Sequence, residues 1–183
     1  MFKNVLNQYS LLLLFVIVGL SACSSPKRYS RGTSYNTKVV KQKKKRTYTK
    51  SKSSAQTTRL KIVSTAKKYI GKSYTYGGKK PSTGFDCSGF TSHVFKNNGI
   101  NLSGASHQQA KLGKRKSKRD LEEGDLVFFG SNNRVSHVAI VADVGHNKIK
   151  VIHSTSSRGV VIDNISTSEY WSKRYLFGRD VLN

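Results

Sequence analysis

Hydrophobic and polar positions divide this chain into regions of different pattern. Residues 11–18 are uniformly apolar, whereas residues 24–57 are Ser, Thr, Lys, Arg and Tyr with almost no aliphatic side chains. From residue 57 the apolar positions recur at helical spacing, and beyond Gly124 they recur at strand spacing. The pattern therefore predicts one folded domain, with helices before strands, behind two segments of a different kind.

The helical part predicts three helices. The first is capped by Thr57 or Thr58 and ends at Gly71, and Leu60, Val63, Lys67 and Ile70 mark one face of it. The second begins at Cys87 and continues through Phe90, Val94 and Phe95 to a stop at Asn98–Gly99. Ser106 and Gln109 have the spacing of a capping box for a short third helix, and residues 114–119 read as a basic surface loop.

The strand part predicts an antiparallel sheet. Apolar residues form short runs at residues 126–129, 138–144, 148–153, 160–163 and 175–179. Gly145–Asn147 has the composition of a hairpin turn between two of these runs. Helices followed by an antiparallel sheet make an α+β domain.

The apolar run near the N-terminus indicates export. It follows the basic Lys3 and is too short to span a membrane, which takes about 20 apolar residues. Leu20–Cys23 (Leu-Ser-Ala-Cys) resembles a bacterial lipobox, in which the cysteine is lipidated and becomes the new N-terminus. We therefore expect residues 1–22 to be a lipoprotein signal peptide and Cys23 to be acylated. An ordinary secretory signal or an uncleaved anchor is the alternative.

Charge separates a tether from the domain. The formal net charge is +24, yet residues 1–56 hold 12 of the 33 Lys and Arg residues and none of the acids. Such a segment buries too little apolar area to fold, so residues 23–56 are expected to form a disordered basic tether before a domain at 57–183. Behind an export signal its partners would be anionic envelope surfaces and not nucleic acid. A tether that is merely solvated is the alternative.

Cys87 is the first candidate for chemistry. Asp86 is a good helix N-cap, so Cys87 falls in the first turn, where unpaired N–H groups and the helix dipole favour the thiolate. If Cys23 is lipidated, Cys87 is the only free thiol of an exported chain. We therefore expect a nucleophile, with a buried core cysteine as the alternative.

Two histidines complete the candidate site. His137 opens one strand, on the face of Ala139 and Val141, and His153 closes the next strand across the hairpin. Antiparallel pairing would bring both to the same end of the sheet. A base beside the thiol and a third group that orients the base are what cysteine nucleophiles require. A zinc site made by Cys87 and both histidines is the alternative, although it lacks local ligand spacing.

Five blocks of sequence, in order, resemble the motifs of the NlpC-type cell-wall endopeptidases. These blocks are Tyr74–Gly78, Phe85–Phe90, Gly124–Phe129, Ser136–Val141 and Ile152–Ser154. The resemblance covers about residues 57–181 and implies a papain-like α+β fold. It departs from the family in the loop between Tyr74 and Cys87 and in the hairpin between the histidines, which both look slightly long.

The resemblance implies roles for particular residues. Cys87 would be the nucleophile, His137 the base and then the acid, and His153 the orienting residue. Tyr74 would lie near the developing oxyanion, which the backbone N–H of Cys87 would also help stabilise. Asp86 and Ser88, on either side of the nucleophile, join Tyr74 as candidate substrate or oxyanion residues.

We therefore expect a monomeric cysteine peptidase that acts on peptidoglycan stem peptides, at the bond between γ-D-glutamate and the diamino acid, without a cofactor. Its lipid anchor would hold it in the cell envelope. Ser24 favours the outer membrane, facing the periplasm, if the cell has two membranes. A non-catalytic wall-binding lipoprotein and an acyltransferase or amidase with the same Cys-His chemistry are the alternatives.

Overall fold

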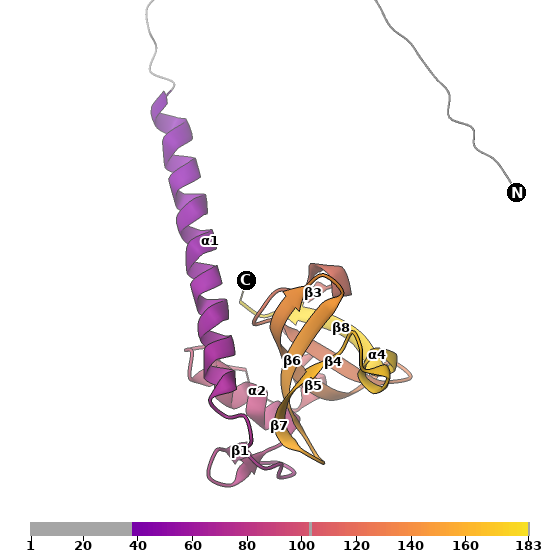
Figure 1. Cartoon of the computed structure of the whole chain (residues 1–183). Helices are drawn as coiled ribbons and strands as arrows, with labels where there is room; N and C mark the ends of the chain where they lie inside the picture. The colour runs from indigo at the N-terminus through magenta and orange to yellow at the C-terminus, as the bar shows by residue number, and fades with distance from the viewer. Residues whose placement is uncertain (1–37, 103, 183) are drawn as a thin grey trace, which may run out of the picture. The chain divides into compact units, whose positions relative to one another are not determined.

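The computed structural model describes residues 38–102 and 104–182, with side chains from residue 53 onward. Figure 1 shows the arrangement of its helices and strands. The first half contains α1 (Lys38–Lys67), β1 (Lys79–Lys80), β2 (Gly84–Phe85), α2 (Cys87–Lys96), α3 (Ser106–Gln109), β3 (Lys114–Lys116) and the 3-10 helix η1 (Lys118–Asp120). The second contains β4 (Leu126–Ser131), β5 (Arg134–Gly145), β6 (Lys148–Thr155), β7 (Gly159–Asn164), α4 (Glu169–Arg174) and β8 (Tyr175–Asp180).

The main sheet is antiparallel, with the strand order β3-β8-β4-β5-β6-β7. Ile140 at its centre faces Leu126 of β4 on one side and Ile152 of β6 on the other. All five predicted strands lie within β4 to β8, and β5 and β6 are joined through His146 and Asn147, of which Asn147 has a positive φ of 53°. The predicted sheet and hairpin are therefore confirmed.

Two hydrophobic clusters pack on the two faces of this sheet. One joins the sheet to α1 and α2 and contains the fully buried Phe85, Phe90 and Phe95, each of which stabilises the fold by about 1.5 to 3 kcal/mol. The other contains Phe129, with Trp171 of α4 packed against it. A helix that begins at a cysteine and packs against an antiparallel sheet is the expected papain-like α+β arrangement (Figure 1).

Helix α1 begins earlier than the sequence predicted. Disorder was expected up to residue 56 and a helix from Thr57, but α1 starts at Lys38. Lys, Arg, Gln and Ala are good helix formers, and no Gly or Pro interrupts the chain between Gly32 and Gly71, so the helix extends N-terminally from its packed end. Thr57 is not a cap, because its hydroxyl donates to the carbonyl of Ser53 one turn earlier. The predicted signal peptide and Cys23 lie outside the described residues.

The buried face of α1 is also rotated from the predicted one. Leu60 is about half exposed, whereas Ile62 and Arg59 are buried together with the expected Val63. The helix ends at Lys67 and not at Gly71, so Ile70, also about half exposed, lies in the turn that follows. Arg59 turns inward because carboxylates of the sheet meet it there. In the part of the chain that the structure describes, no helix is both long and apolar enough to cross a membrane.

Two shorter segments differ from their predictions. The N-cap of α3 is Ala105, whose N–H donates to the side chain of Gln108, and Gln109 is buried and donates to backbone carbonyls. Residues 114–116 are a strand and not a loop, because β3 adds to the edge of β8. Neither element reaches the candidate site.

Candidate active site

The nucleophile candidate is held at the start of α2. The side chain of Asp86 accepts a hydrogen bond from the N–H of Gly89 at 2.6 Å, which fixes the first turn and makes Cys87 the first helical residue. A side chain at Gly89 would place its Cβ 2.0 Å from the carbonyl oxygen of Gly78. The loop from Tyr74 is therefore packed directly against this turn, and the predicted cap is confirmed.

The environment of the thiol differs from the expected one. Burial raises the pKa of Cys87, and the negative charge of Asp86 acts in the same direction. The backbone N–H groups of Val138, Ser88 and Cys87 itself act to lower the pKa and oppose this rise without reversing it. The prediction of a pre-formed thiolate is therefore wrong for the resting site, because desolvation outweighs the favourable helix N-terminus.

The two histidines meet as predicted. Nε2 of His137 lies 3.0 Å from Nδ1 of His153, and the two rings pack edge to face. His153 is completely buried, whereas His137 is partly exposed. His137 does not open its strand as predicted, because β5 begins at Arg134 and pairs His137 with Phe129 of β4. Ala139 and Val141 belong to the second cluster, which confirms that this face of β5 is buried. The contact leaves Nδ1 of His137 as the ring nitrogen available to the thiol.

Both histidines are neutral at rest. Burial and the neighbouring His153 lower the pKa of His137 to about 3. Burial also lowers the pKa of His153, although Asp163 acts to raise it. The resting pair is therefore a thiol and an imidazole, and charge separates only when a reaction moves the proton.

Three residues that the sequence reasoning missed surround the histidines. Asp163 of β7 accepts a hydrogen bond from Nε2 of His153 at 3.0 Å, Arg158 pairs with the same carboxylate, and the indole N–H of Trp171 donates to it at 3.0 Å. The Trp171 ring also stacks on His137, with ring centroids 4.9 Å apart. A signal for Asp163 was present, because the strand alternation puts an acid beside His153 on a buried face.

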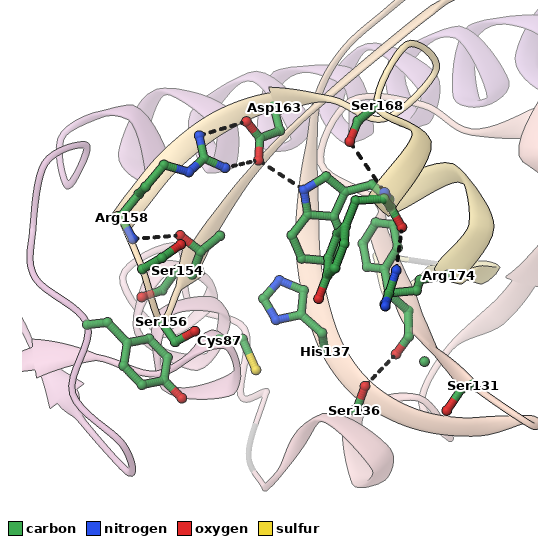
Figure 2. A pocket seen from close by; sticks show the side chains of 17 residues that line it. Cys87, Ser131, Ser136, His137, Ser154, Ser156, Arg158, Asp163, Ser168 and Arg174 are labelled. Carbon is green, nitrogen blue, oxygen red and sulfur yellow. Dashed lines mark hydrogen bonds and ion pairs between the residues drawn. The ribbon is translucent and has the colours of Figure 1, made fainter.

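A cavity of about 720 Å³ opens over these groups (Figure 2). Cys87 and His137 line it together with Tyr74, Trp171, the hydroxyls of Ser131, Ser136, Ser154, Ser156 and Ser157, and Arg158 and Arg174. Burial, together with the charges of Cys87 and Asp86, raises the pKa of Tyr74, so its phenol stays a hydrogen-bond donor at neutral pH. The structure thus brings Cys87, His137 and Tyr74 together at one cavity, and His153 lies buried behind it in contact with His137.

Asp86 and Ser88 have a different place. Ser88 donates its hydroxyl to Asp86 at 3.0 Å, and both belong to the cap of α2, outside the set of residues that line the cavity. Their visible role is to hold Cys87 in position, and direct substrate contact by either stays a prediction.

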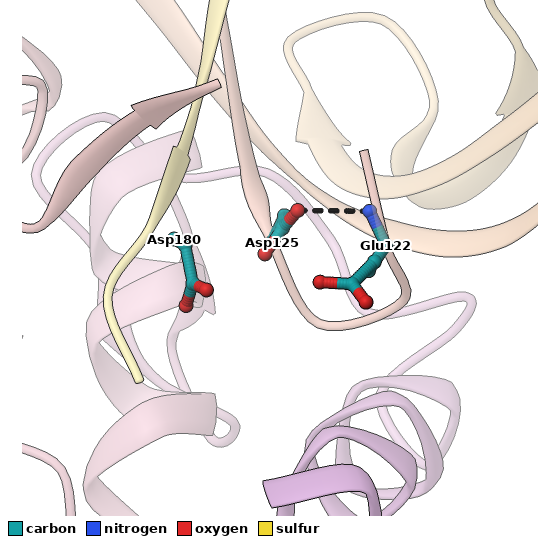
Figure 3. Close-up of side chains that lie close together, drawn as sticks. All are labelled: Glu122, Asp125 and Asp180. Atoms are coloured by element: carbon teal, nitrogen blue, oxygen red, sulfur yellow. Dashed lines mark hydrogen bonds between the residues drawn. The ribbon is translucent and has the colours of Figure 1, made fainter. Parts of the chain in front are cut away.

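Two groups of side chains carry atoms that metals bind: Cys87 with the two histidines, and a cluster of three acids. The two histidines use Nε2 and Nδ1 to bond to each other, which does not suit a shared zinc ion with Cys87. Glu122, Asp125 and Asp180 lie within 4.8 Å of one another (Figure 3). Arg59 pairs with Asp125 and Asp180 at 2.6 Å each, and Lys116 lies 3.1 Å from Asp125. These two cations already occupy the acidic cluster and balance most of its charge, so we assign it to structure and not to a metal.

Comparison with known proteins finds relatives of the folded part of this chain. Residues 71–180 match the model of the NlpC/P60 family. The chain is 39% identical over 124 residues to the gamma-DL-glutamyl hydrolase of Bacillus subtilis (strain 168), covering 66% of this chain and 29% of that protein. It is 36% identical over 114 residues to the murein DD-endopeptidase MepS/murein LD-carboxypeptidase of Escherichia coli (strain K12), covering 62% of this chain and 57% of that protein.

A solved structure gives the same result. The NlpC/p60 domain of the peptidoglycan hydrolase SagA matches with a TM-score of 0.56 and 34% sequence identity, over 67% of this chain and 97% of that chain. The chain spans less than two thirds of the length of the two curated relatives.

Proposed function

The chain belongs to the NlpC/P60 family, and on that premise we propose that it is a cysteine peptidase that cleaves the stem peptides of peptidoglycan. The observation that carries the proposal is the shared cavity of Cys87 and His137, in which His153 holds the second ring nitrogen of His137. The relatives named as hydrolases and endopeptidases support the same reaction class.

The geometry supports a two-step reaction through a thioester. Nδ1 of His137 takes the proton of the Cys87 thiol while the sulfur attacks the carbonyl carbon of the substrate. His137 then gives this proton to the leaving amine as the C–N bond breaks. In the second step His137 takes a proton from water as the water oxygen attacks the carbonyl carbon of the thioester. The C–S bond then breaks, the acid leaves, and His137 returns the proton to the sulfur. His153 orients His137 throughout.

Charge on the carbonyl oxygen needs donors in both steps. The backbone N–H of Cys87 at the start of α2 and the phenol of Tyr74 are the groups we assign to it. Since the pKa of Tyr74 is raised, the phenol keeps its proton over the pH range in which such an enzyme works.

The lining of the cavity supports a γ-linked glutamyl substrate. In a γ-linked chain the α-carboxylate of glutamate is free and negatively charged, and Arg158 and Arg174 are cations of the cavity wall. Arg174 donates to the carbonyl of Tyr170 and stacks on its ring, which leaves guanidinium N–H groups for a ligand. We therefore place the cut at the bond between γ-D-glutamate and the diamino acid. The Escherichia coli relative is named for a DD bond, which makes that cross-link the second candidate.

The location of the enzyme is part of the proposal. Acylation at Cys23 would fix the chain to a membrane of the cell envelope, and the Ser at position 24 favours the outer membrane facing the periplasm. Eleven Lys and Arg residues between Cys23 and Gln56 would add attraction to anionic surfaces, about 1 kcal/mol for each residue near the surface.

Defined substrates test the reaction and its bond. We would incubate the protein with a linear γ-D-glutamyl stem peptide, with a cross-linked muropeptide dimer and with purified sacculi, and identify the products by mass spectrometry. Release of L-Ala-γ-D-Glu is expected. Monomers from the dimer alone would move the cut to the cross-link, and binding to sacculi without any fragment would favour a wall-binding protein. Transfer of the acyl group to an added amine, without hydrolysis, would favour an acyltransferase.

A further inference from the structure

Beyond Cys87, His137 and His153, we propose that Asp163 is a positioning residue of the same reaction, which acts through His153 to set the tautomer of His137 and to support its transient positive charge. The inference rests on the proposed peptidase function. It starts from the hydrogen-bonded row that leads from His137 through His153 to Asp163, with each contact at 3.0 Å.

The hydrogen-bond donors around Asp163 show that it is an acceptor. Oδ2 of Asp163 faces three of them, namely the guanidinium of Arg158, Nε2 of His153 and the indole N–H of Trp171. Oδ1 accepts a further bond from Arg158 at 3.1 Å. Although burial works to raise the pKa of Asp163, these partners lower it, so the carboxylate is ionised at neutral pH. An ionised carboxylate accepts hydrogen bonds and donates none.

This acceptor determines where the protons of both rings lie. A neutral imidazole has one N–H, and Asp163 places that of His153 on Nε2. Nδ1 of His153 is then an acceptor, so Nε2 of His137 must carry the proton of the second ring. Nδ1 of His137 is left unprotonated, and because His137 lines the same cavity as Cys87, we assign Nδ1 as the acceptor of the thiol proton. Without Asp163, the opposite tautomer of His153 would put two N–H groups face to face or turn His137 around.

The same row supports the charged intermediate. When His137 holds the thiol proton, it is an imidazolium whose Nε2–H points at His153, and the proton later leaves with the amine. Asp163 keeps its charge throughout and lies on the far side of His153, where a negative charge favours the imidazolium. His153 is completely buried, so little solvent screens this effect.

Its neighbours hold Asp163 still. Trp171 binds the carboxylate and also stacks on His137, at an interplanar angle of 28°, so one side chain fixes both ends of the row. Arg158 spans both carboxylate oxygens from the rim of the cavity and is half exposed. Asp163 is thereby held in one orientation beside His153.

The test combines kinetics with the tautomers themselves. We would measure kcat and KM for hydrolysis of the stem peptide with Asp163→Ala, His153→Ala and the double variant, and record imidazole ¹⁵N NMR spectra of each free protein. The expected result is a fall in kcat of about 10 to 100-fold for Asp163→Ala with little change in KM. The ¹⁵N shifts of His137 and His153 should move away from the Nε2-protonated form. In the His153→Ala background, Asp163→Ala should add almost nothing, because Asp163 acts through His153.

A matched control is available on β5. Asp143 is also an acid in an ion pair, with Lys148 at 2.7 Å, but it lies outside the residues that line the cavity. Asp143→Ala should leave kcat and the imidazole shifts unchanged. Unchanged tautomers in Asp163→Ala, or losses that simply add in the double variant, would overturn the assignment of Asp163. Failure of the unsubstituted protein to cut any peptide would instead overturn the proposed function. The two failures can be told apart, because the NMR spectra report the tautomers without any substrate.

Discussion

In the buried polar network around Arg59, charged groups meet opposite charges at rest, whereas in the network around His153 the ring that will carry charge is neutral. Arg59 is 3% exposed and lies 2.6 Å from each of two carboxylates, Asp125 and Asp180. His153 is equally buried, but it shares hydrogen bonds with one neutral ring and one carboxylate. The first network joins α1 to the sheet, and the second links a base to a fixed acceptor.

The difference shows what each kind of buried polarity does. A compensated ion pair has no charge left to change, so its loss should appear mainly as lost stability. A row of neutral histidines that ends in a carboxylate is prepared for a charge that arises only during the reaction. Substitutions in the two networks should therefore separate stability from turnover.

The largest effect is expected at the base. His137→Ala should lower kcat by about 10⁴-fold, because it removes the ring that takes the thiol proton. The folded state should survive, since the side chain of His137 is partly exposed. Steady-state hydrolysis of the stem peptide, with circular dichroism as the fold control, measures both. A loss of less than tenfold would contradict the role of His137.

The second effect is on stability. Arg59→Ala should lower the free energy of unfolding by about 3 to 5 kcal/mol, because it leaves Asp125 and Asp180 buried without their closest cation. Chemical denaturation measures this change, and kcat per folded molecule should stay the same. Lys148→Ala, which removes the exposed pair with Asp143, is the control and should cost less than about 1 kcal/mol. A fall in kcat with little loss of stability would contradict the assignment of the Arg59 network to stability and of the His153 network to turnover.

A smaller effect is expected at the orienting residue. His153→Asn should reduce kcat by about 10 to 100-fold, because an amide oxygen replaces part of the hydrogen bonding to His137. His146, exposed at the tip of the β5–β6 hairpin, is a matched histidine control, and His146→Ala should hydrolyse the peptide at the normal rate. Equal losses in both variants would show that the register of the hairpin is wrong.

The smallest effect concerns pH. His137 has a folded pKa of about 3, below its unfolded value of about 6.5, so its neutral form stabilises the fold fully above pH 6.5. As pH falls below 6.5, His137 binds a proton in the unfolded chain but not in the folded site. The free energy of unfolding therefore falls by about 1.4 kcal/mol per pH unit for this one histidine. Denaturation at pH 7.0 and 5.5 should show this loss, and His137→Ala should reduce it. A stability that does not change between these pH values would contradict the buried neutral pair.

Much of the site could be predicted because its signals are local. The cap by Asp86 and the start of α2 at Cys87 follow from residues that are adjacent in the chain. The meeting of His137 and His153 follows from one hairpin, whose register the turn at His146 and Asn147 fixes. Signals from residues close together in the chain were sufficient to predict the start of α2 and the pairing of the two histidines.

The remaining features depend on contacts between distant segments. Trp171 lies on the short helix α4, and the pattern of apolar residues does not predict that this helix packs over His137. Arg59 reads as a surface residue of α1 until two acids more than sixty positions away are brought to it. The raised pKa of Cys87 arises from burial, which the whole fold creates and which the local helix N-terminus cannot overcome. The helix propensity of the basic segment extends α1 back to Lys38, whereas composition predicted a boundary near residue 56.

The most direct test of the account is fragment release from purified sacculi by the unsubstituted protein and by Cys87→Ala, measured by liquid chromatography and mass spectrometry. Cys87 is partly buried among backbone groups, so the variant should keep its fold while losing the sulfur that forms the thioester. The account predicts stem-peptide fragments from the unsubstituted protein and none above background from the variant. Equal release by the two proteins would contradict it, because the reaction would then not need the cysteine around which the site is built.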